Sequence, residues 1–487
     1  MMYSLLSGET EGSPFERQEE NSRMGFEQRK IVGAGLGALL GVLVWLPPTP
    51  VGLTPTGHAV LAILAFAAVF WVFDVLGNAV TSLLMLALFI LAGVKPEHAL
   101  GAFASAPFWL VLGVLFYGAA MQSTGLAKRL SFWVLSWFPP TYPGILAAFL
   151  LIGILLSFAI PSITVRTAIM LPIAWALIQS LGLPPRSRES ALLLLSSLEM
   201  AMIPGLATLY GSLWGPFLVQ LLQTQGYRLE WWEYARAFAV PSLLYSVLLL
   251  AGNWIALRPK QPLGMNREYA RTQLADMGKM NRGEIVTTVI VLVSVLYWAG
   301  ESWHHLPPFL VGMLAIGVFA AFGVLREKDF GNTVPWAFLL FLGALYGLPT
   351  VVQQNQVADW MGGYMLPIIH SVSGNLWVLV SVVAVAMFVV KFIDPVGFLA
   401  VAVLLLPLMA ALKDSGVSPV VLAAVVLLPA HPFWTSYQNI WIVLGEGITG
   451  GQAYDVSQRV RLANVYGVVT IVTLWISVLY WRALGLV

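Results

Sequence analysis

Long apolar segments, repeated along nearly the whole chain, constrain this fold more than any other feature of the sequence. A helix that crosses a lipid bilayer needs about 20 mostly apolar residues. Only 10% of the residues are charged and 59% are hydrophobic, whereas soluble domains carry roughly 25% charged residues. We therefore predict an all-α polytopic membrane protein with about eleven spans, because several segments are short or interrupted. The candidate segments are residues 31–46, 57–74, 78–94, 103–122, 143–159, 190–203, 209–223, 237–257, 285–300, 308–325, 334–350, 376–393, 418–430 and 461–481.

The polar N-terminal residues 1–30 predict a disordered or interfacial tail before a retained first span at residues 31–46. A signal peptide would place its apolar stretch earlier in the chain. Arg29 and Lys30 precede the span, so the positive-inside rule favours a cytoplasmic N-terminus in the inner or plasma membrane. The longest polar interruption, residues 258–284, has an excess of Lys and Arg and predicts a cytoplasmic loop between two halves.

The composition also excludes several classes of function. The net charge of +2 provides no broad basic field for binding nucleic acid. The chain has no cysteine and only six unclustered histidines, so we expect no metal centre and no cofactor beyond Na⁺ as a coupling ion. No phosphate-binding loop of the Walker type and no catalytic constellation at helical spacing is present, so we expect neither an ATP-driven pump nor an enzyme.

The two halves of the sequence resemble each other in order and spacing. Residues 91–118 align with residues 321–347 at an offset of 230, and the segment Phe158-Ala-Ile-Pro161 aligns with Phe392-Ile-Asp-Pro395 at an offset of 234. A helical run that ends in Leu-Pro follows each of the two proline segments. An internal repeat with interrupted apolar segments at matching positions predicts a secondary transporter whose substrate site lies at the interruptions.

An interrupted helix exposes backbone groups that are tolerated in a membrane only where they line a cavity or bind something. The N-terminal ends of half-helices suit a carboxylate or sulfate, and the carbonyl groups at C-terminal ends suit Na⁺. Pro161 and Pro395 each precede such a half-helix. Ser162, Thr164 and Thr167 add hydroxyl groups that can serve either ion, unless they only bond to their own helix.

Arg166 is the most informative single residue, because a buried guanidinium costs roughly 2.5–3.5 kcal/mol on membrane-insertion scales and needs a partner or a water path. Its planar group can bind a carboxylate or sulfate with two hydrogen bonds. The alternatives are an ion pair with Asp394 or Glu199, or a side chain that extends to the interface. Asp394 can also pair with Lys391, which lies three residues before it.

Four segments, taken together, resemble the divalent anion/sodium symporter family, whose members carry dicarboxylates, citrate or sulfate. The segment "SITVRTAIMLP" occupies the place of the family's first Ser-Asn-Thr hairpin tip, and "PGLATLYGS" that of its Gly-rich turn. The similar segments are "FWVFDVLGNAVTSLLMLALFILAGV" (70–94), "LGVLFYGAAMQSTGLAKRL" (112–130), "SITVRTAIMLP" (162–172) and "PGLATLYGS" (204–212).

The resemblance implies a homodimer of inverted repeats, with two re-entrant hairpins, a fixed scaffold and a transport domain that moves like an elevator. By this analogy the hairpin tips lie near residues 161–167 and 394–399 and hold the substrate and Na⁺. The implied parts are the tail 1–30, the scaffold halves 31–130 and 230–370, the transport-domain repeats 131–229 and 371–460, and the C-terminal span 461–487.

The sequence departs from the family at the motifs themselves. The first Ser-Asn-Thr reads Ser162-Ile163-Thr164, the second has no clear counterpart near Asp394, and Gly215 stands where an asparagine is expected. Residues 428–439 align with the family's Thr-Pro-x-Asn turn only ambiguously, through His431-Pro432 or through Asn439. The predicted substrate-binding residues are Ser162, Thr164, Arg166, Thr167, Pro395, Gly397, Thr435, Ser436 and Asn439. The predicted coupling-ion residues are Ser162, Gly205, Thr208, Asp394, Glu199 and His431.

We therefore predict a transporter of a small anion, of the dicarboxylate or sulfate class, driven by Na⁺ or H⁺. The loss of both asparagines weakens the usual Na⁺ sites, whereas Asp394, Glu199 and His431 can titrate. The open alternatives are a cation carrier or an uncoupled exchanger on the same fold, and a membrane receptor that does not transport.

Overall fold

The computed structural model describes residues 14–260, 263, 268–332, 334–392, 394, 397–413 and 415–487. Within these ranges the secondary structure is helical, with no strand, which confirms the predicted all-α class. The helices before the central loop are α1 (Pro14–Trp45), α2 (Pro55–Phe73), α3 (Asn78–Leu91), α4 (Pro96–Leu100), η1 (Gly101–Ala104), α5 (Ala106–Thr124), α6 (Leu126–Leu135), α7 (Tyr142–Ala159), α8 (Ile163–Ser180), α9 (Arg188–Met202), η2 (Ile203–Ala207), α10 (Trp214–Thr224) and α11 (Trp231–Ala256).

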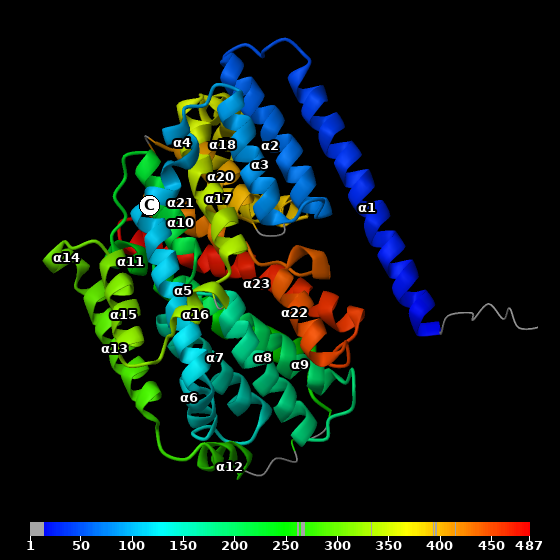
Figure 1. Cartoon of the computed structure of the whole chain (residues 1–487), viewed down its shortest axis with the longest axis vertical. Helices are drawn as coiled ribbons and strands as arrows, with labels where there is room; N and C mark the ends of the chain where they lie inside the picture. Colours follow the sequence, from blue (N-terminus) through cyan, green and yellow to red (C-terminus); the bar gives the residue numbers. More distant parts are fainter. Residues whose placement is uncertain are drawn as a thin grey trace, which may run out of the picture.

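The described residues after the central loop are also folded mainly into helices. The remaining helices are α12 (Glu268–Asp276), α13 (Arg282–Ala299), α14 (Glu301–His304), α15 (Phe309–Ala321), α16 (Glu327–Asn332), α17 (Trp336–Gln354), α18 (Val357–Ser373), α19 (Leu376–Val390), α20 (Phe398–Ala411), α21 (Pro419–Leu427), η3 (Ser436–Gln438), α22 (Ile440–Thr449) and α23 (Val456–Ala483). In Figure 1, α13 to α15 form one edge of the molecule, α12 lies at the bottom, and α1 runs along the opposite side.

Nine helical runs in the described residues are long and apolar enough to cross a membrane, which confirms a polytopic membrane protein. Five further apolar helices in the described residues are shorter than 18 residues, and they include the two helices, α19 and α20, that flank the second predicted interruption. The nine runs are Pro55–Phe73, Pro96–Thr124, Tyr142–Ala159, Ile163–Ser180, Arg188–Ala207, Trp231–Ala256, Arg282–Ala299, Trp336–Gln354 and Val456–Ala483.

The first helix begins earlier than the sequence suggested. Helix α1 starts at Pro14 and therefore includes the second half of the segment 1–30 that was expected to be a tail. Proline is well tolerated in the first turn of a helix. The Glu, Gln, Arg and Lys residues that follow are good helix formers, so polarity alone does not make this segment irregular.

The order of the helices repeats, as the sequence offsets predict. Helices α5 and α17 both have 19 residues and begin 230 positions apart. The interrupted pair α7 and α8 corresponds to α19 and α20, and the series α9, η2, α10 corresponds to α21, η3, α22. Each half then ends in a long helix, α11 or α23. The two interruptions therefore occupy equivalent places in the two halves.

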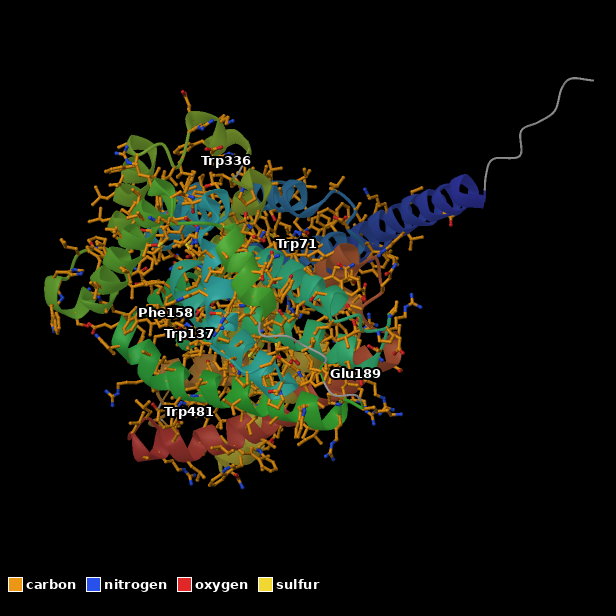
Figure 2. The ribbon with its side chains drawn as sticks, turned by 90° about the horizontal axis from the view of Figure 1, so that it is seen from below. Trp71, Trp137, Phe158, Glu189, Trp336 and Trp481 are labelled. Atoms are coloured by element: carbon orange, nitrogen blue, oxygen red, sulfur yellow. The ribbon has the colours of Figure 1, made fainter. Side chains whose placement is uncertain are left out.

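The two long terminal helices of the halves pack against each other. Trp481 on α23 is fully buried, and its indole N–H donates to the Ala237 carbonyl of α11 at 2.9 Å (Figure 2). The Tyr245 hydroxyl of α11 also contacts the Thr470 hydroxyl of α23. These contacts fix the second half of the chain against the first, close to the elements that carry the interruptions.

Candidate functional site

The first interruption separates α7 from α8. Helix α7 ends at Ala159, residues 160–162 are non-helical, and α8 begins at Ile163. Pro161 has no N–H group to donate, so it does not continue the α7 hydrogen-bond ladder. The Ser162 hydroxyl accepts the Val165 N–H at 3.3 Å and caps α8. We call residues 160–162 the first tip.

Arg166, one turn into α8, is completely buried directly behind the first tip. Its Nε donates to the Ala201 carbonyl at 2.7 Å. Its Nη1 donates to the carbonyls of Ile160, at 2.6 Å, and Gly211, at 2.5 Å. We call these three oxygens the carbonyl cage. Among the residues that the structure describes, no acidic side chain pairs with Arg166, so the expected alternatives of Asp394 and Glu199 are not its partners.

All three cage carbonyls belong to backbone that leaves regular helix. Ile160 is the C-cap of α7, Ala201 lies in the last turn of α9, and Gly211 lies in the turn before α10. The last carbonyls of a helix have no partner in the helix and carry its partial negative charge. The cage is thus the kind of site that the sequence predicted for a cation, and the guanidinium fills it.

The Gly-rich turn leaves room for the guanidinium. A Cβ atom on Gly205 would stand 2.3 Å from Arg166 Nη2, and one on Gly211 would stand 2.6 Å from the Gly205 oxygen. The Thr208 hydroxyl closes the other side of Gly211. The predicted coupling-ion residues Gly205 and Thr208 therefore pack around Arg166. Thr167 is also buried there, and its hydroxyl has no hydrogen-bond partner within the described ranges.

The second interruption lies between α19 and α20, at residues 391–397, which we call the second tip. Asp394 accepts two backbone N–H groups, those of Gly397 and Ala400, both at 2.8 Å. It therefore caps the start of α20. Lys391 is buried, and its Nζ lies 3.0 Å from the position of a Cβ on Gly397. The predicted residue Pro395 lies outside the described residues.

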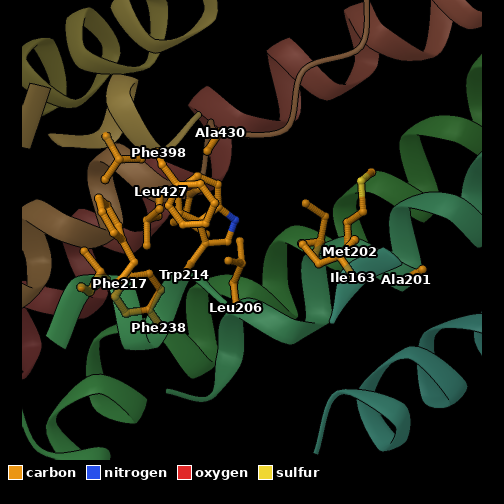
Figure 3. Close-up of a cluster of buried hydrophobic side chains, with 14 of the residues drawn as sticks. Ile163, Ala201, Met202, Leu206, Trp214, Phe217, Phe238, Phe398, Leu427 and Ala430 are labelled. Atoms are coloured by element: carbon orange, nitrogen blue, oxygen red, sulfur yellow. The ribbon is translucent and has the colours of Figure 1, made fainter. Parts of the chain in front are cut away.

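His431 lies in a buried aromatic environment beside the second tip. Its Nε2 accepts the indole N–H of Trp214 at 3.3 Å, and its backbone N–H donates to the Tyr466 hydroxyl at 2.8 Å. The Trp214 ring packs against Phe398, the first residue of α20, with centroids 4.4 Å apart (Figure 3). Trp214 is not among the residues predicted from the sequence, although it directly precedes Gly215, the position at which the family has an asparagine.

The turn before α22 meets the start of α8. Asn439 caps α22 by accepting the Trp441 N–H at 3.1 Å, and its Nδ2 donates to the His431 carbonyl at 3.4 Å. The Trp441 indole donates to the Thr164 hydroxyl at 3.0 Å. Thr164 and Thr435 are both exposed. Trp441 is a second site residue that is absent from the sequence-based predictions, because nothing in the sequence relates it to Thr164.

Two predicted residues lie apart from this group. Ser436 donates to Glu446 at 2.7 Å, and both contact Arg459 at the start of α23. Glu199 is buried on α9 and accepts a hydrogen bond from Asn253 of α11. The structure therefore gathers Ser162, Gly205 and Thr208 around Arg166, with Asn439 and His431 beside them. Thr164 lies at the exposed start of α8 and contacts Trp441, and neither Ser436 nor Glu199 joins the group.

An all-helical membrane protein with two equivalent helix interruptions, and a buried cationic side chain at each, has the architecture of a secondary transporter. Residues 29–487 match the family described as the sodium:sulfate symporter transmembrane region, and the chain belongs to this family. The predicted resemblance is thereby confirmed, as is the prediction of a transporter rather than an enzyme.

The chain is also similar in sequence to curated relatives, and in fold to a solved structure. The sodium-dependent dicarboxylate transporter SdcS of Staphylococcus saprophyticus is 25% identical over 82% of this chain and 81% of its own. The chloroplastic dicarboxylate transporter 1 of Spinacia oleracea is 22% identical over 92% of this chain and 80% of its own. The fold is similar to the crystal structure of the YdaH transporter of Alcanivorax borkumensis, which is described as having an unusual topology. The superposition covers 95% of this chain and 98% of that chain, with a TM-score of 0.50 and 14% sequence identity.

Proposed function

We propose that this protein is a secondary active transporter that carries a small dicarboxylate, with sulfate as the next candidate cargo. One observation carries the proposal: Arg166 is fully buried at a helix interruption, and no acidic partner balances it among the described residues. A buried cation without a counter-ion favours a bound anion nearby. Both named relatives are dicarboxylate transporters, which supports the same cargo class.

The anion would bind in front of the first tip rather than on the guanidinium itself, because Arg166 is already bonded to the carbonyl cage. The exposed Thr164 hydroxyl accepts a hydrogen bond from Trp441 and keeps its own O–H to donate. The start of α8 adds unpaired N–H groups and a partial positive charge. Thr435, in the turn before α22, is also exposed and is the second hydroxyl that we propose for the substrate site. In this proposal Arg166 acts on the anion through its charge.

We further propose that transport occurs by an elevator-like alternating-access movement. The protein would act as a homodimer in the plasma membrane, with a cytoplasmic N-terminus. The moving part would comprise residues 131–229 and 371–460, and the scaffold residues 31–130 and 230–370. Several hydrogen bonds cross this division and would have to break during the movement, and two of them lie close to the Gly-rich turn. These two join Tyr210 to Glu301 and Tyr346 to the Leu213 carbonyl, each at 3.0 Å.

The coupling ion would be Na⁺ or H⁺, and the name of the staphylococcal relative supports Na⁺. The test is uptake of labelled succinate, malate and sulfate into proteoliposomes in which Na⁺ and pH gradients are imposed independently. We expect saturable uptake of a dicarboxylate that one of the two gradients increases. Liposomes that take up none of the three anions under any gradient would refute the proposed function.

A further inference from the structure

The carbonyl cage is built like a cation site, and the chain fills it with its own cation. Three backbone oxygens from three separate segments converge on one guanidinium, at 2.5, 2.6 and 2.7 Å. Backbone carbonyls are ligands that hard monovalent cations accept, and helix C-terminal ends favour positive charge. We propose that Arg166 is a tethered replacement for a free cation at the first tip, so that the wild-type protein binds no Na⁺ there. This inference rests on the proposed function for its consequence in transport.

The surrounding residues fit this role better than an ordinary structural arginine. Nη2 has no hydrogen-bond partner in the described part of the chain, and Gly205 leaves just enough space for it. A structural arginine elsewhere in the same protein is bound differently. Arg129 also donates to three backbone carbonyls, those of Met277, Gly278 and Lys279, but it pairs in addition with the Glu284 carboxylate at 2.7 Å, which neutralises it locally. Arg166 has only neutral ligands, as an ion in a carbonyl site does.

The position of Arg166 on α8 also ties the charge to the interruption. The segment that carries Arg166 also supplies one oxygen of the carbonyl cage, because the carbonyl of Ile160 lies only six residues earlier. The other two oxygens come from the end of α9 and from the turn that precedes α10. A cation in this cage therefore joins the first tip to the Gly-rich turn. In the wild-type protein this cation is the side chain of Arg166, which is covalently part of α8. It therefore cannot leave the cage by dissociating into solution during the transport cycle.

The direct test removes the tether and offers the cation in solution. Arg166→Ala empties the cage, and guanidinium chloride at low millimolar concentration, far below denaturing levels, is the probe. We expect guanidinium to raise the Tm of purified Arg166→Ala saturably, by about 1–3 °C relative to equal choline chloride. The wild-type protein and Arg188→Ala, which removes an exposed arginine on α9, should show no such rise. An Arg166→Ala protein that folds and ignores guanidinium would overturn the inference.

A second pair of variants covers the case in which Arg166→Ala does not fold. Arg166→Lys keeps a tethered cation, whereas Arg166→Met keeps most of the length without the charge. We expect Arg166→Lys to retain at least about tenfold more succinate counterflow than Arg166→Met, with the higher Tm of the two. Equal or better performance of Arg166→Met would overturn the inference. Absence of counterflow in the wild-type protein would instead refute the proposed function, while the Tm comparison would still decide the role of Arg166.

Discussion

Gly205 has no space for a side chain, because Nη2 of Arg166 lies 2.3 Å from the place where a Cβ atom would stand. Real Cβ atoms do not approach other heavy atoms this closely, so either the η2 turn or the guanidinium would have to move. The guanidinium is held by three carbonyls, and a shift would break at least one of those hydrogen bonds. The position of the Arg166 guanidinium therefore requires a glycine at position 205.

Gly205→Ala should destabilise the protein and impair transport together. Overpacking of a buried site costs typically 1–3 kcal/mol, which should lower the Tm measurably in a thermal-shift assay. Gly317→Ala is the matched control, since no atom lies within 4 Å of a Cβ at that exposed helical position. Equal Tm values and equal transport rates for Gly205→Ala and Gly317→Ala would contradict the close packing of Gly205 against Arg166.

Thr164→Val should weaken substrate binding, while its effect on stability should be limited to the loss of one exposed hydrogen bond, that from Trp441. The Thr164 hydroxyl is exposed at the start of α8 and accepts the Trp441 indole N–H at 3.0 Å. A lost hydrogen bond to a charged ligand is worth about 1.5–3 kcal/mol, so we expect KM for the anion to rise roughly tenfold or more. Thr288→Val, whose hydroxyl bonds only to its own helix α13, is the control. An unchanged KM in Thr164→Val would remove Thr164 from the substrate site.

Asp394→Ala should lose more stability than Asp394→Asn, because the carboxylate caps α20 with both oxygens. Loss of a helix cap costs about 0.5–2 kcal/mol, and an asparagine oxygen can keep one of the two hydrogen bonds. Thermal unfolding of both variants, with the exposed Asp359→Ala as a control, measures the difference. Asp394→Asn that keeps full stability but loses its response to a Na⁺ or pH gradient would instead identify Asp394 as a coupling residue.

Asp455, just before the last long helix α23, predicts an acid-sensitive contribution to stability. The Ser457 hydroxyl and then the Gln458 backbone N–H, at 2.7 and 2.8 Å, hold the pKa of the Asp455 carboxyl below its usual 3.8. A depressed carboxyl pKa stabilises the fold above the unfolded-state pKa, and this contribution is lost as the pH falls through the folded-state value. Asp455→Ala should therefore lower stability by about 1 kcal/mol at neutral pH. The difference from the wild-type protein should shrink below about pH 4, and a difference that stays constant down to pH 3 would contradict this cap.

Much of the fold could be predicted from the sequence, because hydrophobic segments of bilayer length are a local signal. The interruptions at Pro161 and Pro395 are also local signals in the sequence, since a proline beside polar or charged residues stands out in an apolar run. The helical nature of residues 14–30 was missed because a polar segment reads as a tail unless helix propensity is also weighed.

The contacts of the site were much harder to predict. Arg166 was expected to meet a side chain or a ligand, whereas its partners are backbone carbonyls, two of them 35 and 45 residues away. Every residue has a carbonyl, so sequence identity carries no signal for such a partner. The same holds for Asp394, whose partners are two N–H groups of the following turn. The Trp441 and Thr164 contact joins residues 277 positions apart.

Counterflow of labelled succinate is the most decisive measurement of anion transport by this protein, because it needs no ion gradient and so separates transport of the anion from its coupling to Na⁺ or H⁺. Proteoliposomes preloaded with unlabelled succinate are placed in medium with a trace of labelled succinate. We expect a transient accumulation of label that disappears when the liposomes are loaded with buffer alone. No accumulation of label with succinate, and none with malate or sulfate in the same format, would contradict anion transport by this protein.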